Sequence, residues 1–519
     1  MSKKKIILPL FFITSLASCN IAPLLTKTKY VKETEFPEIK KDEEGEGYYR
    51  LKEYKTLQYG KSSSLKSINS LRDIYSSGIS HYNAPSTGNI YSLVIPVNFI
   101  DSDKSNNERQ KIIINNALFG ARKSTSYESL SSFYDYSSYG QLSFDGMVTD
   151  FYEYPYKAAD LNKSGTSSIS SKIAGNALKW FYDNNPNEDM AKYDQDNDGF
   201  IDTLFIIYNY PSSDSSSSLW WAYADHMSLS VEGNVNRPYG SSYTWLSYDF
   251  LEKKKNIAET HVAIHESGHL FGLQDYYNTN SNAYFQPTGY VDMMDRNIGD
   301  HTGYSKMLLN WTTPYVTRGS GSITLKPFTT SGDLLLIPTN KGWNQTPYDE
   351  YLLLEYYVPT GLYKKEAGTK YVYKDKSGQQ KVFTFLNEMG LKVYHVDSRI
   401  GYFDSRFAHN LLTVLGDDDE QEVLENKSNF CIDFAYSNTI SDSKALTSPV
   451  LYHLLQKGEK NTLLDGVPFE GDSLFKKNDS FGVNDFKNFK FNNGSSLTYS
   501  FEITDMNSSG ITISFNELS

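Results

Sequence analysis

The apolar positions in the first two thirds of this chain follow a mixed pattern of strands and helices. IYSLVIPVNFID (90–101) and DTLFIIYNY (202–210) predict buried strands, because short apolar runs of this length end in turn residues. Helical periodicity is expected at 107–119 and 168–185, and residues 129–152 predict a helix that leads into strands. This alternation is typical of a domain in which helices cover a sheet.

After the glycine-rich RGSGS (318–322) the pattern changes to short alternating strands. These are ITLKPF, DLLLIP, YLLLEYYV, KVFTFL and GLKVYHV, and SLTYSFEITDMNSSGITISF at the end predicts a hairpin around Asn507–Gly510. No fixed-period repeat is visible. We therefore predict an α+β domain with a mixed sheet over residues 86–317, and a β-rich C-terminal domain over residues 318–519.

The first residues have the pattern of an export signal. Three lysines precede IILPLFFITSLA, an apolar run of 12 residues that is too short to span a bilayer. The following LASC (16–19) resembles the lipobox of bacterial lipoproteins, in which the cysteine is lipidated. Residues 1–19 are thus expected to be a signal peptide ending at Cys19, with the protein anchored on the extracellular face of the bacterial membrane. The alternative is an ordinary secretory signal with an incidental cysteine.

Residues 20–85 are polar with weak periodicity, and we expect a tether or a pro-segment there. The net charge of −12 and pI near 5.3 argue against a nucleic-acid partner. Only Cys431 follows Cys19, so the mature chain can form no internal disulfide. An exported chain of this kind depends on its core or on bound metal, and we expect a monomer.

HESGHLFGLQD (265–275) carries the clearest chemistry. His265 and His269 share one helix face at spacing four, and Glu266 lies beside them, placed to take a proton from water. Gly272 allows a left-handed exit from the helix, which can return Asp275 as a third ligand. Three protein ligands and one open position are the common arrangement of catalytic zinc. The alternative is a surface helix with scattered polar residues.

The helix that carries this motif is expected to run from near Asn256 to Gly272. His261 lies one turn earlier on the same face. A row at i, i+4 and i+8 spans about 12 Å, which is too long for three rings to converge on one ion. His301 would have to reach the metal through a loop. Asp275 is therefore the expected third ligand.

Several segments together resemble one known family. HESGHLFGLQDYYN is similar to the zinc motif of the immune inhibitor A family of secreted bacterial metallopeptidases. SLSSFYDYSSYGQLSFDGMV, DQDNDGFIDTLFIIYN, VDMMDRNIGDHTGYSKMLLNW and EYLLLEYY…GLKVYHVD occur in that family's order. The resemblance covers roughly residues 90 to 400. Two positions depart from the pattern, Val291 and the pair Asn310-Trp311, where the family usually has Trp and Gly-Trp; both concern packing rather than ligands.

The resemblance implies a zincin- or metzincin-like catalytic domain that hydrolyses extracellular proteins or peptides. It makes His265, His269 and Asp275 zinc ligands and Glu266 the general base and acid. Met294 of the VDMM segment would supply a methionine turn beneath the metal.

The expected mechanism also requires a donor to the developing oxyanion. His301 and Tyr304, just after the methionine pair, are candidates for this role or for substrate contact. The alternative is that both side chains only pack or bond to loops.

A second acidic constellation is DQDNDGFID (194–202). Its carboxylates alternate around Gly199 as at the start of an EF-hand loop, although Phe205 stands where an EF-hand has its last Glu. We expect a structural calcium ion held by Asp194, Asp196, Asp198 and Asp202. The alternative is a solvated acidic turn.

The sequence therefore favours a zinc endopeptidase on the outer face of a bacterial membrane. Two alternatives stay open: a non-catalytic binding lipoprotein of the same fold, such as an adhesin or nutrient receptor, and a zinc amidase or deacetylase. Loss of Glu266 or of a ligand would favour the first alternative, and none is lost here.

Overall fold

The computed structural model describes residues 26–518 except 33–34, 37, 41–42, 60–65, 69–83, 162–165, 214–217, 228–232, 281, 400, 404–410, 415–441, 443–449 and 488. Cys19 and Cys431 lie outside the described residues. The described chain forms two compact units, residues 26–35 with 84–274, and residues 36–68 with 275–518. Within the described residues, no helix combines the length and the apolar character needed to cross a membrane.

The first unit is built on a mixed sheet in the order β10-β12-β9-β5-β6, with β7 also paired to β5. The pairs among β12, β9, β5, β6 and β7 are parallel, and β10 is antiparallel to β12. Its strands are β5 (Gly88–Asn98), β6 (Leu142–Val148), β7 (Tyr152–Glu153), β9 (Leu204–Tyr208), β10 (Tyr223–His226) and β12 (Ser242–Ser247). A short parallel pair is formed by β8 (Phe200–Ile201) and β11 (Tyr239–Gly240).

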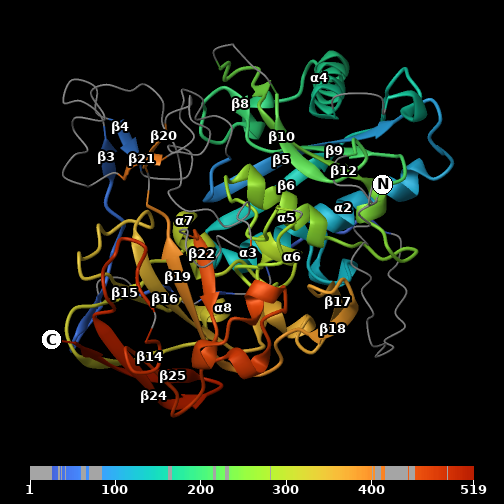
Figure 1. The fold of residues 1–519 in the computed structure, drawn as a ribbon. Helices are drawn as coiled ribbons and strands as arrows, with labels where there is room; N and C mark the ends of the chain where they lie inside the picture. Colours follow the sequence, from blue (N-terminus) through green and yellow to red (C-terminus); the bar gives the residue numbers. More distant parts are fainter. Residues whose placement is uncertain are drawn as a thin grey trace. The chain divides into compact units, whose positions relative to one another are not determined.

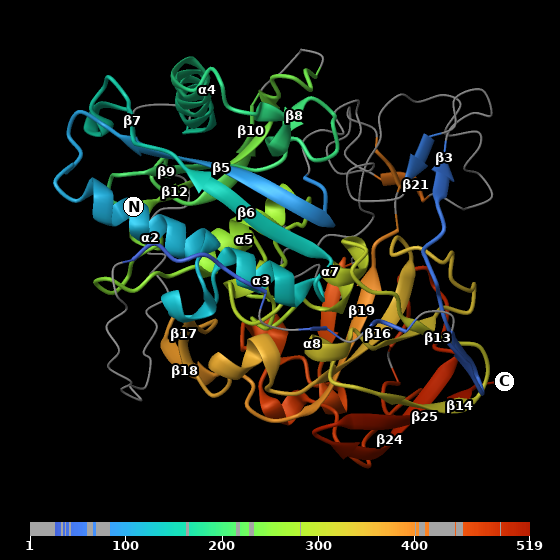
Figure 2. The same cartoon turned by 180° about the vertical axis from the view of Figure 1, so that it is seen from behind.

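Helices cover both faces of this sheet, with α4 on one face and α2, α3 and α5 on the other (Figures 1 and 2). The helices are α2 (Asn107–Phe119), α3 (Leu130–Ser137), α4 (Thr166–Asn184) and α5 (His261–Leu270). Ile95, Ile206 and Trp245 pack against α4 in one hydrophobic cluster. The neighbouring residues along β5, β9 and β12, which point to the opposite face of the sheet, are also buried. Helices on both faces shield such a sheet from water.

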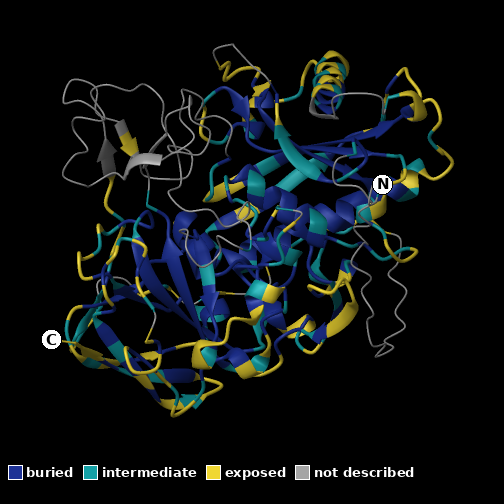
Figure 3. Ribbon diagram, viewed as in Figure 1, coloured by how far each residue is buried: buried dark blue, intermediate teal, exposed yellow. Residues whose placement is uncertain are grey.

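The second unit contains a large sheet and a smaller antiparallel one. The large sheet has the order β1-β2-β13-β15-β16-β19-β22 and the smaller one β14-β25-β24-β23. Figure 3 shows β16 and β19 buried along their whole length. The two sheets share a core that includes Leu335, Leu354, Phe501 and Ile513.

The second unit contains short helices and the strands of these two and of smaller sheets. Its helices are α6 (Met293–Arg296), α7 (Gly303–Leu308) and α8 (Phe328–Ser331). Its strands are β1 (Glu44–Gly45), β2 (Tyr48–Arg50), β3 (Leu57–Tyr59), β4 (Lys66–Ile68), β13 (Tyr315–Thr317), β14 (Gly321–Leu325), β15 (Leu334–Pro338), β16 (Glu350–Tyr357), β17 (Lys370–Lys374), β18 (Gln380–Thr384), β19 (Gly390–Asp397), β20 (Gly401–Phe403), β21 (Leu411–Val414), β22 (Tyr452–Leu455), β23 (Ser480–Phe481), β24 (Tyr499–Asn507) and β25 (Gly510–Glu517).

The N-terminal stretch that the sequence marked as a tether or pro-segment is bonded into the fold where it is described. In the first unit, Tyr30 donates its N–H to the Phe119 carbonyl at 2.7 Å and its hydroxyl to Asp135 at 2.7 Å. In the second unit, β2 lies beside β13 in the large sheet. The bond from the Tyr30 N–H and the pairing of β2 with β13 use backbone groups, which a weakly periodic polar sequence does not reveal.

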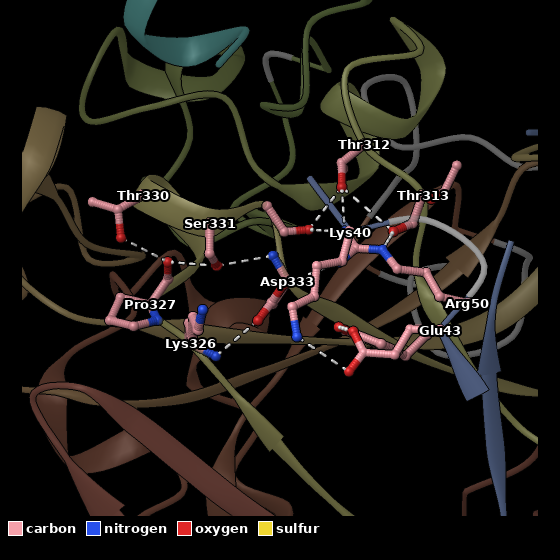
Figure 4. Close-up of polar contacts among 12 residues, drawn as sticks. Lys40, Glu43, Arg50, Thr312, Thr313, Lys326, Pro327, Thr330, Ser331 and Asp333 are labelled. Carbon is pink, nitrogen blue, oxygen red and sulfur yellow. Dashed lines mark hydrogen bonds and ion pairs between the residues drawn. The ribbon is translucent and has the colours of Figure 1, made fainter. Parts of the chain in front are cut away.

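Arg50 at the end of β2 is buried, with only 3% of its surface exposed. Its guanidinium donates to the Thr313 carbonyl at 2.9 Å, to Asp333 Oδ1 at 3.1 Å and to Thr312 Oγ1 at 3.2 Å. The cation also lies over the Tyr315 ring, 4.6 Å from its centroid. Figure 4 shows the polar surroundings of Arg50, with Thr312, Thr313 and Asp333. A buried cation with this many partners holds β2 in place.

The architecture is mixed α and β with several sheets and few helices, consistent with the expected α+β class. The helix at 107–119 and the hairpin paired through Asn507 and Gly510 are confirmed. The expected helix start near Asn256 is wrong, because α5 begins at His261. Asn256 has a φ of +66°, and Ala258 pairs with Thr125 in an isolated bridge, so this stretch is extended and turned rather than helical. The domain boundary at 317/318 stays a prediction.

Candidate metal centre

Helix α5 presents both motif histidines from one face. The rings of His265 and His269 lie 4.9 Å apart at 85° to each other. Spacing four on a helix places the two residues on the same face. His265 and Glu266 are buried, at 5% and 7% exposure. The helix is seated by Ile264 and Leu270, which are 0% and 1% exposed.

A tyrosine from a neighbouring helix fixes α5 directly before the first histidine. The hydroxyl of Tyr134 on α3 donates to the Ile264 carbonyl at 2.8 Å, and both groups are buried. At the start of α5, the side chain of Glu259 accepts hydrogen bonds from the N–H groups of Thr260 at 2.9 Å and His261 at 3.1 Å. These bonds satisfy two donors that a helix start leaves without intrahelical partners.

The helix exit has the expected left-handed glycine. Gly272 has a φ of +91°, and the next residue, Leu273, donates its N–H to the Gly268 carbonyl at 3.1 Å. This reversal is local to the motif. His265, His269 and Asp275 each offer one ligand atom, and these atoms all lie within 4.8 Å of one another.

The turn also orients one of the rings. His269 Nδ1 lies 2.7 Å from the Leu273 carbonyl oxygen. A carbonyl oxygen can only accept, so Nδ1 carries the proton and the lone pair is on Nε2. A histidine that ligates a metal commonly has its other nitrogen fixed in this way.

His261 has a different environment. Its ring stacks on Tyr127, with centroids 4.5 Å apart and planes at 17°, and its Nδ1 is bonded to Glu259. Among the described residues, the group around His265 does not include His261. These contacts suit a structural histidine that holds the start of α5.

The segment after Asp275 is tied to the methionine pair. Tyr276 donates its N–H to the Met294 carbonyl at 2.8 Å, and Met294 is fully buried. Asp292 precedes the pair as the N-cap of α6, and its side chain accepts the Met294 N–H at 2.6 Å. Burial raises the pKa of the Asp292 carboxyl to about 7, although its hydrogen bonds oppose the shift.

His301 and Tyr304 are both buried, at 0% and 2% exposure. The His301 ring lies 5.9 Å from the Trp311 ring, and the Tyr304 ring lies 5.0 Å from the Tyr452 ring. Neither residue belongs to the metal-type group found among the described residues. Burial against aromatic rings is what the packing alternative predicts for them.

The acidic loop gathers three of its four expected carboxylates. Asp194, Asp196 and Asp202 offer oxygens within 4.8 Å of one another, whereas Asp198 is outside this group and accepts the Phe200 N–H at 2.9 Å. Burial raises the pKa of Asp194, and the neighbouring charge of Asp196 adds to that shift. Crowded carboxylates of this kind gain from a bound cation.

Sequence reasoning did not single out Tyr134, Glu259, Asp292 or Tyr452. Asp292 had a usable signal, since an Asp directly before a short helical run is a typical N-cap. For Tyr134 and Tyr452 the contacts join distant parts of the chain. In a sequence with 41 tyrosines, nothing marks these two.

Comparison with known proteins adds no family to this geometry. No protein-family model matches the chain, and no curated protein matches it. The resemblance to the immune inhibitor A family therefore stays a prediction from the sequence motifs.

Proposed function

We propose that this protein is a zinc-dependent endopeptidase that hydrolyses extracellular proteins or peptides. One observation carries the proposal: two imidazole nitrogens and one carboxylate oxygen lie within 4.8 Å of one another, with Glu266 next to the first ligand. Two histidines and one carboxylate are a common ligand set of catalytic zinc, in which a fourth position is left for water.

The donor chemistry fits this ion. Because the Nδ1 proton of His269 is fixed, the lone pair of the neutral ring is on Nε2, where it can bind a metal. Asp275 adds a negative charge that offsets part of the metal's charge. Zinc bound there would supply Lewis acidity, lowering the pKa of water toward neutrality and polarising a peptide carbonyl.

The chain's own residues supply the proton transfers. Glu266 follows the first histidine on α5 and is not a member of the ligand group. Its carboxylate takes a proton from the attacking water and returns it to the nitrogen of the leaving amine, so one group serves as base and then as acid. The hydrogen bond from Tyr134 to the Ile264 carbonyl limits movement of the helix turn that carries Glu266.

Casein zymography with and without a zinc chelator tests the activity. We expect clearing that the chelator abolishes and added zinc restores. Glu266→Ala should retain zinc and the fold while losing several powers of ten in rate, because only the base is removed. Normal digestion by Glu266→Ala would overturn the assignment. Zinc binding without turnover of casein or peptides would point to a binding lipoprotein, and turnover of acetylated substrates alone would point to a deacetylase.

The proposal includes a structural calcium ion at residues 194–202, supported by the grouped carboxylates of Asp194, Asp196 and Asp202. It also includes a lipid on Cys19 and a location on the extracellular membrane face, supported by the LASC sequence. The expected partners are peptide substrates and the membrane.

A further inference from the structure

Tyr276, the residue after the expected third ligand, is held in two directions. It is buried at 1% exposure, and its N–H donates to the Met294 carbonyl at 2.8 Å. Its hydroxyl is hydrogen-bonded to Ser305 Oγ at 2.8 Å. Backbone and side chain are both restrained, so the adjoining Asp275 has little freedom to move.

A strand from the C-terminal part of the chain contacts the same place. Tyr452, the first residue of β22, is fully buried, and its ring lies 5.2 Å from the Tyr276 ring at 63°. This is an edge-to-face arrangement that stabilises an aromatic pair. The Tyr452 hydroxyl donates to Thr302 Oγ1 at 2.6 Å.

Thr302 extends these contacts to the methionine turn. Its hydroxyl donates to Asp292 Oδ2 at 2.6 Å, and the other oxygen of Asp292 accepts the Met294 N–H at 2.6 Å. Since the Met294 carbonyl in turn accepts the Tyr276 N–H, these contacts lead back to Tyr276 in a closed circuit. All its members belong to the second unit and are buried.

We propose that Tyr452 and Thr302 are positioning residues for the metal centre, which hold Asp275 in place through Tyr276 and the methionine turn. This inference rests on the proposed function, because it takes Asp275 as a zinc ligand. It assigns a task in the metal centre to a strand of the C-terminal region. Residues that orient ligands without touching the metal typically change affinity by 10- to 100-fold when they are replaced.

Tyr452→Phe removes only the hydroxyl and leaves the ring on Tyr276. We expect zinc affinity, measured by competition with a chromophoric chelator, to fall about tenfold. The visible absorption of the Co²⁺-substituted protein should also change, since it reports ligand geometry. Tyr356→Phe is the matched control, because that buried hydroxyl donates to the Asn507 carbonyl at 2.7 Å elsewhere in the second unit. It should lower Tm by a similar amount without altering either metal readout.

Thr302→Val removes the middle of the same chain of hydrogen bonds and should lower zinc affinity comparably. The double variant should bind zinc as tightly as the single variant that has the lower zinc affinity, because both changes break the same network. Wild-type zinc affinity and an unchanged Co²⁺ spectrum in both single variants would overturn the inference while leaving the proposed function intact. A wild-type protein that binds no zinc through His265 and His269 would overturn the proposed function itself.

Discussion

At the scale of single residues, the choice of third ligand is the sharpest question. Asp275→Ala should lower zinc affinity by more than roughly a hundredfold, because losing a ligand costs more than losing a residue that merely orients one. His261→Ala should leave zinc affinity unchanged, since that ring is stacked on Tyr127 and bonded to Glu259. Elemental analysis and chelator competition measure both. Full zinc content in Asp275→Ala with loss in His301→Ala would move the ligand to His301.

Asp292 should give the protein a pH-dependent stability. Its pKa in the folded protein is raised from 3.8 to about 7, chiefly by burial, and Asp295 adds to the shift. The negative charge of Asp292 also helps to raise the pKa of three buried tyrosines, Tyr363, Tyr394 and Tyr452. The folded state therefore holds a proton more tightly than the unfolded chain. This contribution to stability is complete below pH 3.8 and is lost as the pH rises through 7.

The Asp292→Asn variant tests this linkage, because its amide does not titrate. We expect the Tm of wild type to fall relative to that of the variant between pH 4 and pH 7, and the difference to stay constant above that range. Thermal melts across the range measure it. A constant difference over the whole range would show that Asp292 keeps one protonation state.

At the scale of an element, the acidic loop before β8 should respond to calcium. Saturating calcium should raise Tm by roughly 5–10 °C, as binding at about a hundred times Kd stabilises by about 2.7 kcal/mol. The physical reason is relief of repulsion among Asp194, Asp196 and Asp202. Asp194→Asn should lose most of the response. Identical melts of wild type with calcium and with a calcium chelator, and no calcium by elemental analysis, would rule the ion out.

The element β2 should behave as a permanent part of the fold. Arg50→Ala leaves the buried Asp333 without its cation, and breaking a buried pair costs about 3–5 kcal/mol. A Tm lower by roughly 10 °C is expected. Arg318→Ala is the matched control, because its pair with Glu44 is exposed and should contribute about 1 kcal/mol or less. Equal melts of the two variants would mean that β2 detaches easily, as a removable pro-segment does.

At the scale of the whole molecule, the proposed lipid on Cys19 would determine where the protein acts. Wild-type protein should partition with membranes, and Cys19→Ser should be found in the soluble fraction because it cannot accept the lipid. Fractionation and mass spectrometry of the N-terminal peptide measure this. A wild-type protein recovered wholly in soluble form, without lipid, would contradict the anchor.

Sequence by itself determined the elements whose periodicity is strong and the side-chain group whose spacing is local. The helix at 107–119 and the C-terminal hairpin agree with the structure because their patterns depend on near neighbours. The same holds for the group of His265, His269 and Asp275, since a helical turn and one left-handed glycine bring these residues together within one short segment.

Only the tertiary structure decided the contacts between distant segments. The start of α5 was expected too early, because the bridge between Ala258 and Thr125 competes with the helix and no local pattern records it. Tyr452 is brought to Tyr276 by strand order in the large sheet. Arg50 is buried because β2 pairs with β13. Such pairings depend on which strands meet in the folded chain. No local sequence pattern specifies them, because they result from all the interactions of the chain together.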